Sequence, residues 1–128
     1  MTDAPFFAES LTFTKDGLIP AIAQQYDTGE VLMMAWMSAD SLAETLASGR
    51  VCYWSRSRKA FWRKGDTSGH IQKLVELRYD CDGDTLLVLV DQTGAACHEG
   101  TRSCFTRLAS PDGRVSPADT ALPAQIKG

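Results

Sequence analysis

Apolar residues along this chain gather in short runs that are separated by polar turns. Two of these runs, residues 18–26 and 31–37, flank a stretch in which Asp27, Thr28 and Gly29 are typical of tight turns. This pattern predicts a β-hairpin. Further apolar runs predict additional strands, over residues 51–55, 70–82, 85–92 and 104–108.

One segment, residues 38–49, indicates a short helix. Ser38 is a good N-terminal cap, Asp40 suits the positive end of the helix dipole, and Gly49 suits the C-terminal exit. Residues 56–69 are polar and basic, and they predict a long loop. Because strands outnumber helices, we expect an α+β fold with a mostly antiparallel sheet and one or two short helices.

The length of 128 residues indicates a single domain. We expect residues 1–10 to form an N-terminal arm and residues 11–108 to form the folded body. Residues 109–128 contain three of the five prolines, so we expect an irregular C-terminal tail.

The net charge of −3 does not favour nucleic acid or an anionic membrane as a partner. No apolar run approaches the ~20 residues that a membrane-spanning helix needs. The first ten residues lack the basic start and apolar core of a secretion signal, so we expect a cytoplasmic protein. In that reducing compartment, the four cysteines indicate metal binding or catalysis more than the two disulfides that their even number also permits.

Three aspartates surround one cysteine in the segment DCDGD, residues 80–84. If this segment stays extended, Asp80, Asp82 and Asp84 share one face, and Cys81 points to the other. Three carboxylates on one face repel one another unless a cation joins them, and their hard oxygen atoms favour magnesium or calcium. A solvated turn is the alternative, because the segment is also a good turn sequence.

The cysteines are candidate zinc ligands. Cys81, Cys97 and Cys104 lack the C-x-x-C spacing that is common in structural zinc sites. Three protein ligands with an open fourth position are nevertheless the pattern of catalytic zinc. The alternative is that the cysteines are buried as small apolar residues. That alternative suits Cys52, which lies in a predicted strand, better than Cys97 and Cys104, whose connecting segment is polar.

The segment DCDGDTLLVLVDQTGAACHEGTRSCF, residues 80–105, resembles the signature of the phosphoribosyl-AMP cyclohydrolase family of histidine biosynthesis. Three upstream motifs match the same family in order, and they are GEVLMMAWMSADSL, YWSRSRKAFWRKGDTSGH and IQKLVELRYDCDGD. The resemblance covers about residues 15–108, which is nearly the whole predicted body. Several motifs in the same order make it far more specific than any one of them.

The resemblance implies one zinc ion and one magnesium ion per subunit. Its zinc ligands correspond to Cys81, Cys97 and Cys104. Its magnesium ligands correspond to Asp80, Asp82 and Asp84. It also implies an intertwined homodimer in which each zinc site takes cysteines from both chains.

The reaction that the resemblance implies is the third step of histidine biosynthesis. The purine ring of 1-(5-phosphoribosyl)-AMP opens when water adds at ring carbon 6 and the bond to nitrogen 1 then breaks. A zinc-bound water, whose pKa falls to about 7, is the expected nucleophile. Because thiolate ligands make zinc a weaker acid, we expect a nearby base or cation to assist.

His98 is the candidate catalytic residue, because it adjoins Cys97 and because the pKa of an imidazole suits proton transfer. The alternative is that His98 only orients Cys97 or a water molecule. His70 begins a predicted strand and is a candidate either for substrate contact or for packing.

The two phosphates of the implied substrate require a cationic surface. The candidate substrate-binding residues are Trp54, Ser55, Arg56, Arg58, Trp62, Lys64, His70 and Arg102. Arginine suits bidentate phosphate contacts, and tryptophan suits stacking on a purine. The alternative is a solvated basic loop.

Two other function classes use similar residues. A zinc-stabilised nucleic-acid-binding module would use the same basic loop, but the acidic net charge and the clustered aspartates count against it. A base deaminase would carry H-x-E and P-C-x-x-C motifs, and neither occurs in the sequence. We therefore expect a small nucleotide as the substrate, and neither nucleic acid nor a membrane as a partner.

Overall fold

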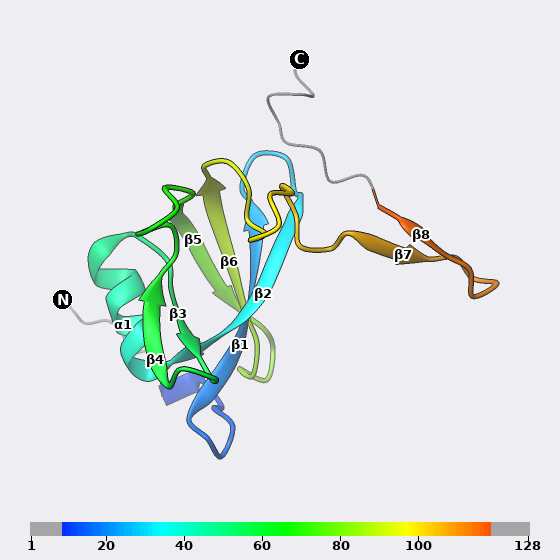
Figure 1. The fold of residues 1–128 in the computed structure, drawn as a ribbon. Coiled ribbons are helices and arrows are strands. Elements are labelled where there is room, and N and C mark those ends of the chain that lie inside the picture. Colours follow the sequence, from blue (N-terminus) through cyan, green and yellow to red (C-terminus); the bar gives the residue numbers. More distant parts are fainter. Residues whose placement is uncertain (1–8, 119–128) are drawn as a thin grey trace.

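A computed structural model describes residues 9–118, which form a twisted six-stranded sheet, one α-helix and a separate two-stranded hairpin (Figure 1). The elements, in chain order, are β1 (Leu18–Gln25), β2 (Val31–Ser38), α1 (Ala39–Ser48), β3 (Cys52–Ser55), β4 (Ala60–Arg63), β5 (Gln72–Tyr79), β6 (Leu86–Gln92), β7 (Arg107–Ala109) and β8 (Val115–Pro117).

The main sheet has the strand order β4-β3-β2-β1-β6-β5. All neighbouring strands are antiparallel except β1 and β6, which run parallel. The prediction of an α+β fold with a mostly antiparallel sheet is therefore confirmed. Within residues 9–118, no helix is both long and apolar enough to cross a membrane.

The predicted hairpin and helix are both confirmed. The turn between β1 and β2 closes where Gly29 adopts a φ of +81° and its N–H donates to the Gln25 carbonyl at 3.0 Å. At the start of α1, the Ser38 Oγ accepts the Ser41 N–H at 3.1 Å. At its end, Gly49 adopts a φ of +75°, a left-handed conformation that glycine tolerates well.

The predicted loop over residues 56–69 is wrong in part, because Ala60–Arg63 form β4. This strand pairs with β3, so that Tyr53 lies opposite Trp62 and Trp54 lies opposite Phe61. Charged residues on both sides of Phe61 and Trp62 hide this short strand in the sequence.

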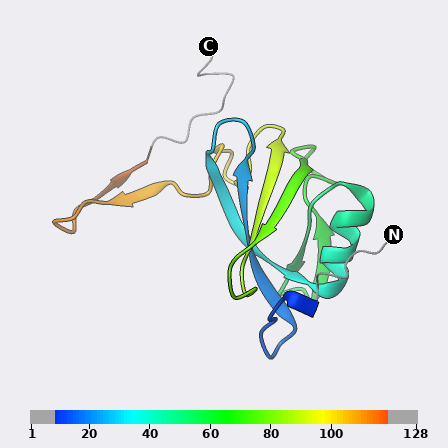
Figure 2. The ribbon, with the colours of Figure 1, turned by 180° about the vertical axis from the view of Figure 1, so that it is seen from behind.

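The C-terminal predictions also need correction. The strand expected over residues 104–108 begins only at Arg107 and is β7. Residues 109–118 are not irregular, because β8 pairs with β7 as a hairpin that projects away from the main sheet (Figures 1 and 2). The rest of the expected tail, and residues 1–8 of the expected arm, lie outside the described residues.

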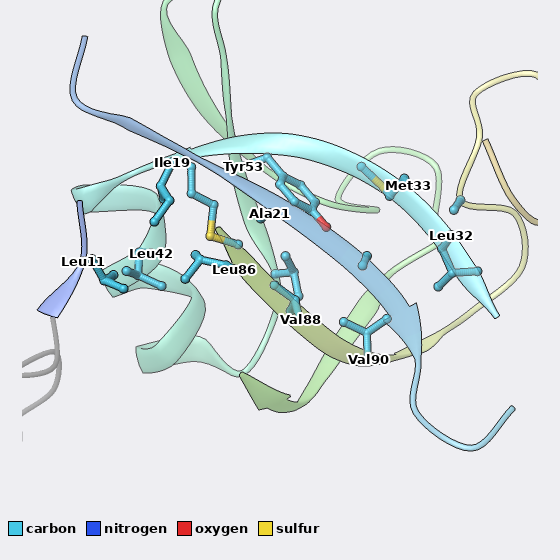
Figure 3. Packing of buried hydrophobic residues seen from close by; sticks show 14 residues of the cluster. Leu11, Ile19, Ala21, Leu32, Met33, Leu42, Tyr53, Leu86, Val88 and Val90 are labelled. Atoms are coloured by element: carbon cyan, nitrogen blue, oxygen red, sulfur yellow. The ribbon is translucent and has the colours of Figure 1, made fainter. Parts of the chain in front are cut away.

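The core lies between α1 and one face of the main sheet. Alternate residues of β1, including Ile19 and Ala21, point into it and are fully buried. Leu42 from α1 and Val88 from β6 pack there, and Figure 3 shows these side chains gathered with the ring of Tyr53.

The other face of the sheet, here called the outer face, is also largely apolar. Strand register places Trp36 opposite Pro20 and also opposite Trp54, while Met34 lies opposite Ile22. The apolar side chains of the outer face are Pro20, Ile22, Met34, Trp36, Trp54, Phe61, Leu87 and Leu89. All are at least partly exposed, and Met34 and Phe61 are almost half exposed. An antiparallel sheet that faces water normally carries polar side chains on that face.

Candidate metal and substrate site

The acidic turn, residues 80–84, connects β5 to β6 and brings the three predicted carboxylates together. One oxygen from each of Asp80, Asp82 and Asp84 lies within 4.8 Å of the others. The N–H of Asp84 donates to Asp80 Oδ1 at 2.9 Å, so the segment folds back on itself. The segment is therefore the turn that the sequence also allowed and not extended, and the three carboxylates cluster in it.

The three carboxylates of the acidic turn crowd negative charge in a small space. The Asp80 and Asp82 carboxylates, which accept a hydrogen bond from protonated Asp84 and repel its charged form, raise the pKa of Asp84. A bound cation would offset this crowding of charge, and the oxygen donor set fits magnesium or calcium. At Gly83 the acidic turn packs closely against the N-terminal segment. The φ of Gly83 is +73°, and a Cβ there would lie 2.1 Å from the Ser10 carbonyl oxygen.

The thiol loop, residues 94–104, brings Cys97 and Cys104 together after the end of β6. The Cys104 N–H donates to the Leu32 carbonyl at 2.7 Å, which ties the loop to β2. A backbone hydrogen bond from Glu99 lowers the pKa of Cys97, and bonds from Thr101 and Cys104 act in the same direction. Partial burial raises the pKa of Cys104 to about 11, and the neighbouring Cys97 adds to this effect. The adjacent sulfur atoms form a donor pair that fits a soft cation such as zinc.

The third predicted zinc ligand lies elsewhere in the chain. Cys81 belongs to the acidic turn, before β6, whereas Cys97 and Cys104 follow it. The loops before and after β6 lie at opposite ends of this strand (Figure 1). The seven residues of β6 span roughly 20 Å at the usual rise of a strand. The three cysteines therefore do not meet within one chain.

Arg102 holds the thiol loop in place. Its side chain is only 5% exposed, and Nη1 donates to the carbonyls of Gln92 and Gly94, both at 2.8 Å. Nη2 donates to Gln25 Oε1 at 2.9 Å, and Nε faces Glu30 at 3.4 Å. The guanidinium is thus engaged by protein acceptors. This arrangement favours a structural role over the phosphate contact expected from the sequence.

A chain of buried polar side chains, which was not predicted from the sequence, leads to the thiol loop. The Tyr53 hydroxyl donates to Gln72 Oε1 at 2.7 Å, and Gln72 Nε2 donates to Gln92 Oε1 at 2.8 Å. Gln92 Nε2 also donates to the Thr93 carbonyl at 2.9 Å. The signal in the sequence is the inward register of Gln92, which follows the buried Val90 by two residues.

A cavity of about 390 Å³ lies beside the predicted basic segment. Arg58, Trp62, Lys64, Thr67 and Ser68 line it, so it combines cations, hydroxyl donors and an aromatic ring. Lys64 Nζ donates to the Ala96 carbonyl at 2.6 Å, one residue before Cys97. Lys64 therefore connects the cavity to the thiol loop.

Comparison with known proteins gives the family. The model of the phosphoribosyl-AMP cyclohydrolase family matches residues 33–106, which is more than half of the chain. The chain belongs to this family. A phosphoribosyl-AMP cyclohydrolase of Rhodospirillum centenum is 67% identical over 119 residues, covering 93% of this chain and 89% of the relative. Those of Acidiphilium cryptum and Rhodospirillum rubrum are 67% and 58% identical, covering 79% and 88% of this chain and 87% and 79% of those proteins.

The matched region of this cyclohydrolase chain runs from β2 to the residues just before β7. It includes the acidic turn, the thiol loop and the cavity-lining segment. The chain is thus an enzyme of the cyclohydrolase family.

The two tryptophans predicted to stack on the purine lie on opposite faces of the cyclohydrolase sheet. Trp62 points to the core side, where its ring centroid is 5.3 Å from that of Tyr53, and it lines the cavity. Trp54 lies on the outer face, opposite Trp36. The guanidinium of Arg56 sits 5.0 Å from the centroid of the Trp36 ring. The two indoles therefore do not sandwich one base within one chain.

The histidines and Ser55 also have distinct surroundings. His98 is exposed in the thiol loop, next to Cys97, as its predicted role requires. His70 is half-buried, and its ring lies so close to Gly94 that a Cβ there would be 2.9 Å from His70 Cδ2. The Ser55 Oγ accepts the Arg58 N–H at 3.2 Å, which shapes the turn before β4. Substrate contacts by these side chains stay predictions.

Proposed function

We propose that this protein hydrolyses 1-(5-phosphoribosyl)-AMP in histidine biosynthesis, by adding water at ring carbon 6 and cleaving the bond to nitrogen 1. The observation that carries this proposal is the convergence of Cys97 and Cys104 beside a cavity with cationic and aromatic walls, in a chain of the cyclohydrolase family. The same site combines a place for a soft metal with a place for an anionic nucleotide.

In this proposal each subunit uses one zinc ion and one magnesium ion. Cys97 and Cys104 hold the zinc together with Cys81 of a second copy, and Asp80, Asp82 and Asp84 hold the magnesium. When bound, zinc would lower the pKa of a water molecule toward neutrality and so provide the nucleophile.

The residues of the chain supply binding and proton transfer. Trp62 offers a ring face for the purine, and Arg58 with the hydroxyl groups of Thr67 and Ser68 offers donors to a phosphate. His98 is exposed beside Cys97 and takes the proton from the attacking water. Breaking the bond to nitrogen 1 then requires a proton at that nitrogen.

A homodimer completes the zinc site in this proposal. Because β6 separates Cys81 from the thiol loop, a single chain supplies only two adjacent thiols. A two-fold axis over the outer face would set the acidic-turn end of one sheet against the thiol-loop end of the other. Cys81 of each chain would then approach the thiol pair of its partner.

Two exposed apolar features support this dimer. The outer face is apolar across β4, β3, β2, β1 and β6, as expected of a surface that a second sheet covers. The β7–β8 hairpin follows the thiol loop. Leu108 and Val115 on it are 44% and 69% exposed, and Phe105 just before it is 52% exposed. A two-stranded hairpin is marginally stable alone, so it is expected to pack on a second copy.

The reaction is tested with purified, metal-loaded protein and the synthetic nucleotide. Ring opening changes the ultraviolet spectrum of the purine and releases no ammonia. A spectral change without ammonia is the expected result. Ammonia release would indicate deamination, and no change at all would contradict the proposal.

The shared site is tested with two variants, Cys81→Ala and Cys97→Ala, that carry different affinity tags and are co-expressed. A purified heterodimer has one intact zinc site, so we expect about half of the wild-type activity and zinc content. The control heterodimer pairs Cys97→Ala with Cys104→Ala and has no intact site. Equal inactivity of both heterodimers would rule out the shared arrangement.

A further inference from the structure

We propose that Lys64 is a positioning residue for the zinc ligands, whose ammonium group fixes the thiol loop and balances the charge of Cys97 and Cys104. This role replaces the substrate contact expected for Lys64 from the sequence. The inference rests on the proposed function, because the two thiols carry full negative charge only when a metal binds them.

The geometry directs the ammonium group at the thiol loop. Lys64 Nζ donates to the Ala96 carbonyl at 2.6 Å, and Ala96 is the residue before Cys97. The Lys64 N–H donates to the carbonyl of the buried Val51 at 2.9 Å, which fixes the start of the side chain. Nζ also lies 5.6 Å from the centroid of the Trp62 ring. The Lys64 side chain is therefore fixed at its backbone and at its ammonium group, between the cavity and the thiol loop.

The electrostatic surroundings point to the sulfur atoms as its counter-charge. Lys64 is only partly exposed, and its Nζ lies at the backbone that leads directly into Cys97. Its neighbour Arg63 pairs with Glu44 and Asp66, whereas Lys64 pairs with no carboxylate of residues 9–118. A half-buried cation needs an anion nearby to offset its desolvation, and a thiolate pair supplies one.

The chemistry of a thiolate site explains why a cation is useful there. Three thiolates around one divalent zinc leave a net charge of about −1, which weakens zinc as a Lewis acid. An ammonium beside two of the thiolates offsets this charge. Lys64 is thus the nearby cation that was expected from the sequence. It acts through Cys97 and Cys104 and not on the nucleotide.

The test compares Lys64→Met, Lys64→Arg and wild type as full chains. Zinc affinity is measured by competition with a chromophoric chelator, and kcat and KM are measured on fully zinc-loaded protein. We expect Lys64→Met to bind zinc about ten- to a hundredfold more weakly, with a lower kcat and a nearly unchanged KM. Lys64→Arg keeps the charge and should restore most of the zinc affinity. Lys73→Met, which removes an exposed lysine of β5, is the matched control and should change none of these values.

Three results would overturn the inference. A raised KM with unchanged zinc affinity would make Lys64 a phosphate ligand. Loss of thermal stability in Lys64→Met without rescue by Lys64→Arg would make its role purely structural. If the wild type binds no zinc or has no ring-opening activity, the proposed function itself fails and the inference falls with it. The wild-type measurement therefore separates the two failures.

Discussion

Arg102 Nη2 donates a hydrogen bond to Gln25 Oε1 at 2.9 Å, and the same oxygen accepts the Gln92 N–H at 2.9 Å. One amide oxygen thus joins the end of β1, the end of β6 and the thiol loop. Since β1 and β6 are parallel neighbours, both strands end beside this loop. The position of the two thiols therefore depends on the buried guanidinium of Arg102, which bonds to protein acceptors.

The first prediction concerns Arg102→Met. The change leaves the carbonyls of Gln92 and Gly94 and the oxygen of Gln25 without their donors, so the free energy of unfolding should fall by about 2–4 kcal/mol. Zinc affinity should fall with it. Urea unfolding and metal analysis measure both. Arg114→Met removes an exposed arginine that pairs with Asp112, and it should cost about 0–1 kcal/mol. Equal effects of the two changes would contradict the structural role of Arg102.

The second prediction compares two glycines with similar backbone angles. Gly17 and Gly83 have φ values of +78° and +73°, so alanine strains the backbone similarly at both positions and costs roughly 1–2 kcal/mol. Only at Gly83 does the new Cβ meet an atom, the Ser10 carbonyl oxygen at 2.1 Å.

Gly83→Ala should therefore destabilise the protein more than Gly17→Ala, and it should also weaken magnesium binding at the acidic turn. Urea unfolding and calorimetric titration with magnesium measure these effects. If the two variants unfold at the same urea concentration, the close packing of the acidic turn against Ser10 is not maintained in solution.

The third prediction concerns Tyr53→Phe, which leaves Gln72 Oε1 without its buried donor. The free energy of unfolding at neutral pH should fall by about 1–3 kcal/mol. Burial raises the pKa of Tyr53 in the folded protein, whereas an unfolded tyrosine ionises near pH ~10.

The sign of the pH effect follows from that shift. The neutral phenol stabilises the fold fully below about pH 10, and this contribution is lost as the pH rises further, by about 1.4 kcal/mol per unit. Phenylalanine cannot ionise, so the stability gap between wild type and Tyr53→Phe should narrow above that pH. Urea unfolding of both proteins at a series of pH values on both sides of pH ~10 measures the gap. A constant gap would refute the raised pKa of Tyr53 in the folded protein.

The fourth prediction concerns Asp82→Asn. Loss of one carboxylate from the acidic turn should raise the magnesium concentration needed for activity, while zinc content stays close to that of the wild type. Metal analysis and activity at graded magnesium concentrations measure the two effects. Loss of both metals together would mean that the acidic turn and the thiol site do not act as separate sites.

Local patterns in the sequence were enough to predict most of the fold. Apolar runs predicted the strands of the main sheet apart from β4, and Ser38 and Gly49 predicted the ends of α1 because capping is a local interaction. The strand β4 was missed because only Phe61 and Trp62 carry an apolar signal there, between charged neighbours. The strand β8, and with it the hairpin, was missed because its exposed residues show no burial pattern.

The candidate site was predictable where ligands are close in sequence. Asp80, Asp82 and Asp84 cluster whether their segment is extended or turned. The role of Arg102 was not predictable, because its acceptors come from residues that are distant along the chain, such as Gln25. Likewise, the side of the sheet that holds Trp54 depends on a strand register that only the folded chain defines.

The length of β6 also matters for a newly synthesised polypeptide that has not yet met its copy. A strand of seven residues keeps the three aspartates and Cys81 at one end and Cys97 and Cys104 at the other, so a metal ion that prefers sulfur meets two adjacent thiols in one chain and not three. Metals that prefer sulfur bind such an incomplete ligand set less tightly. If the dimer proposed above forms, a full set of three thiols exists only after two chains have associated.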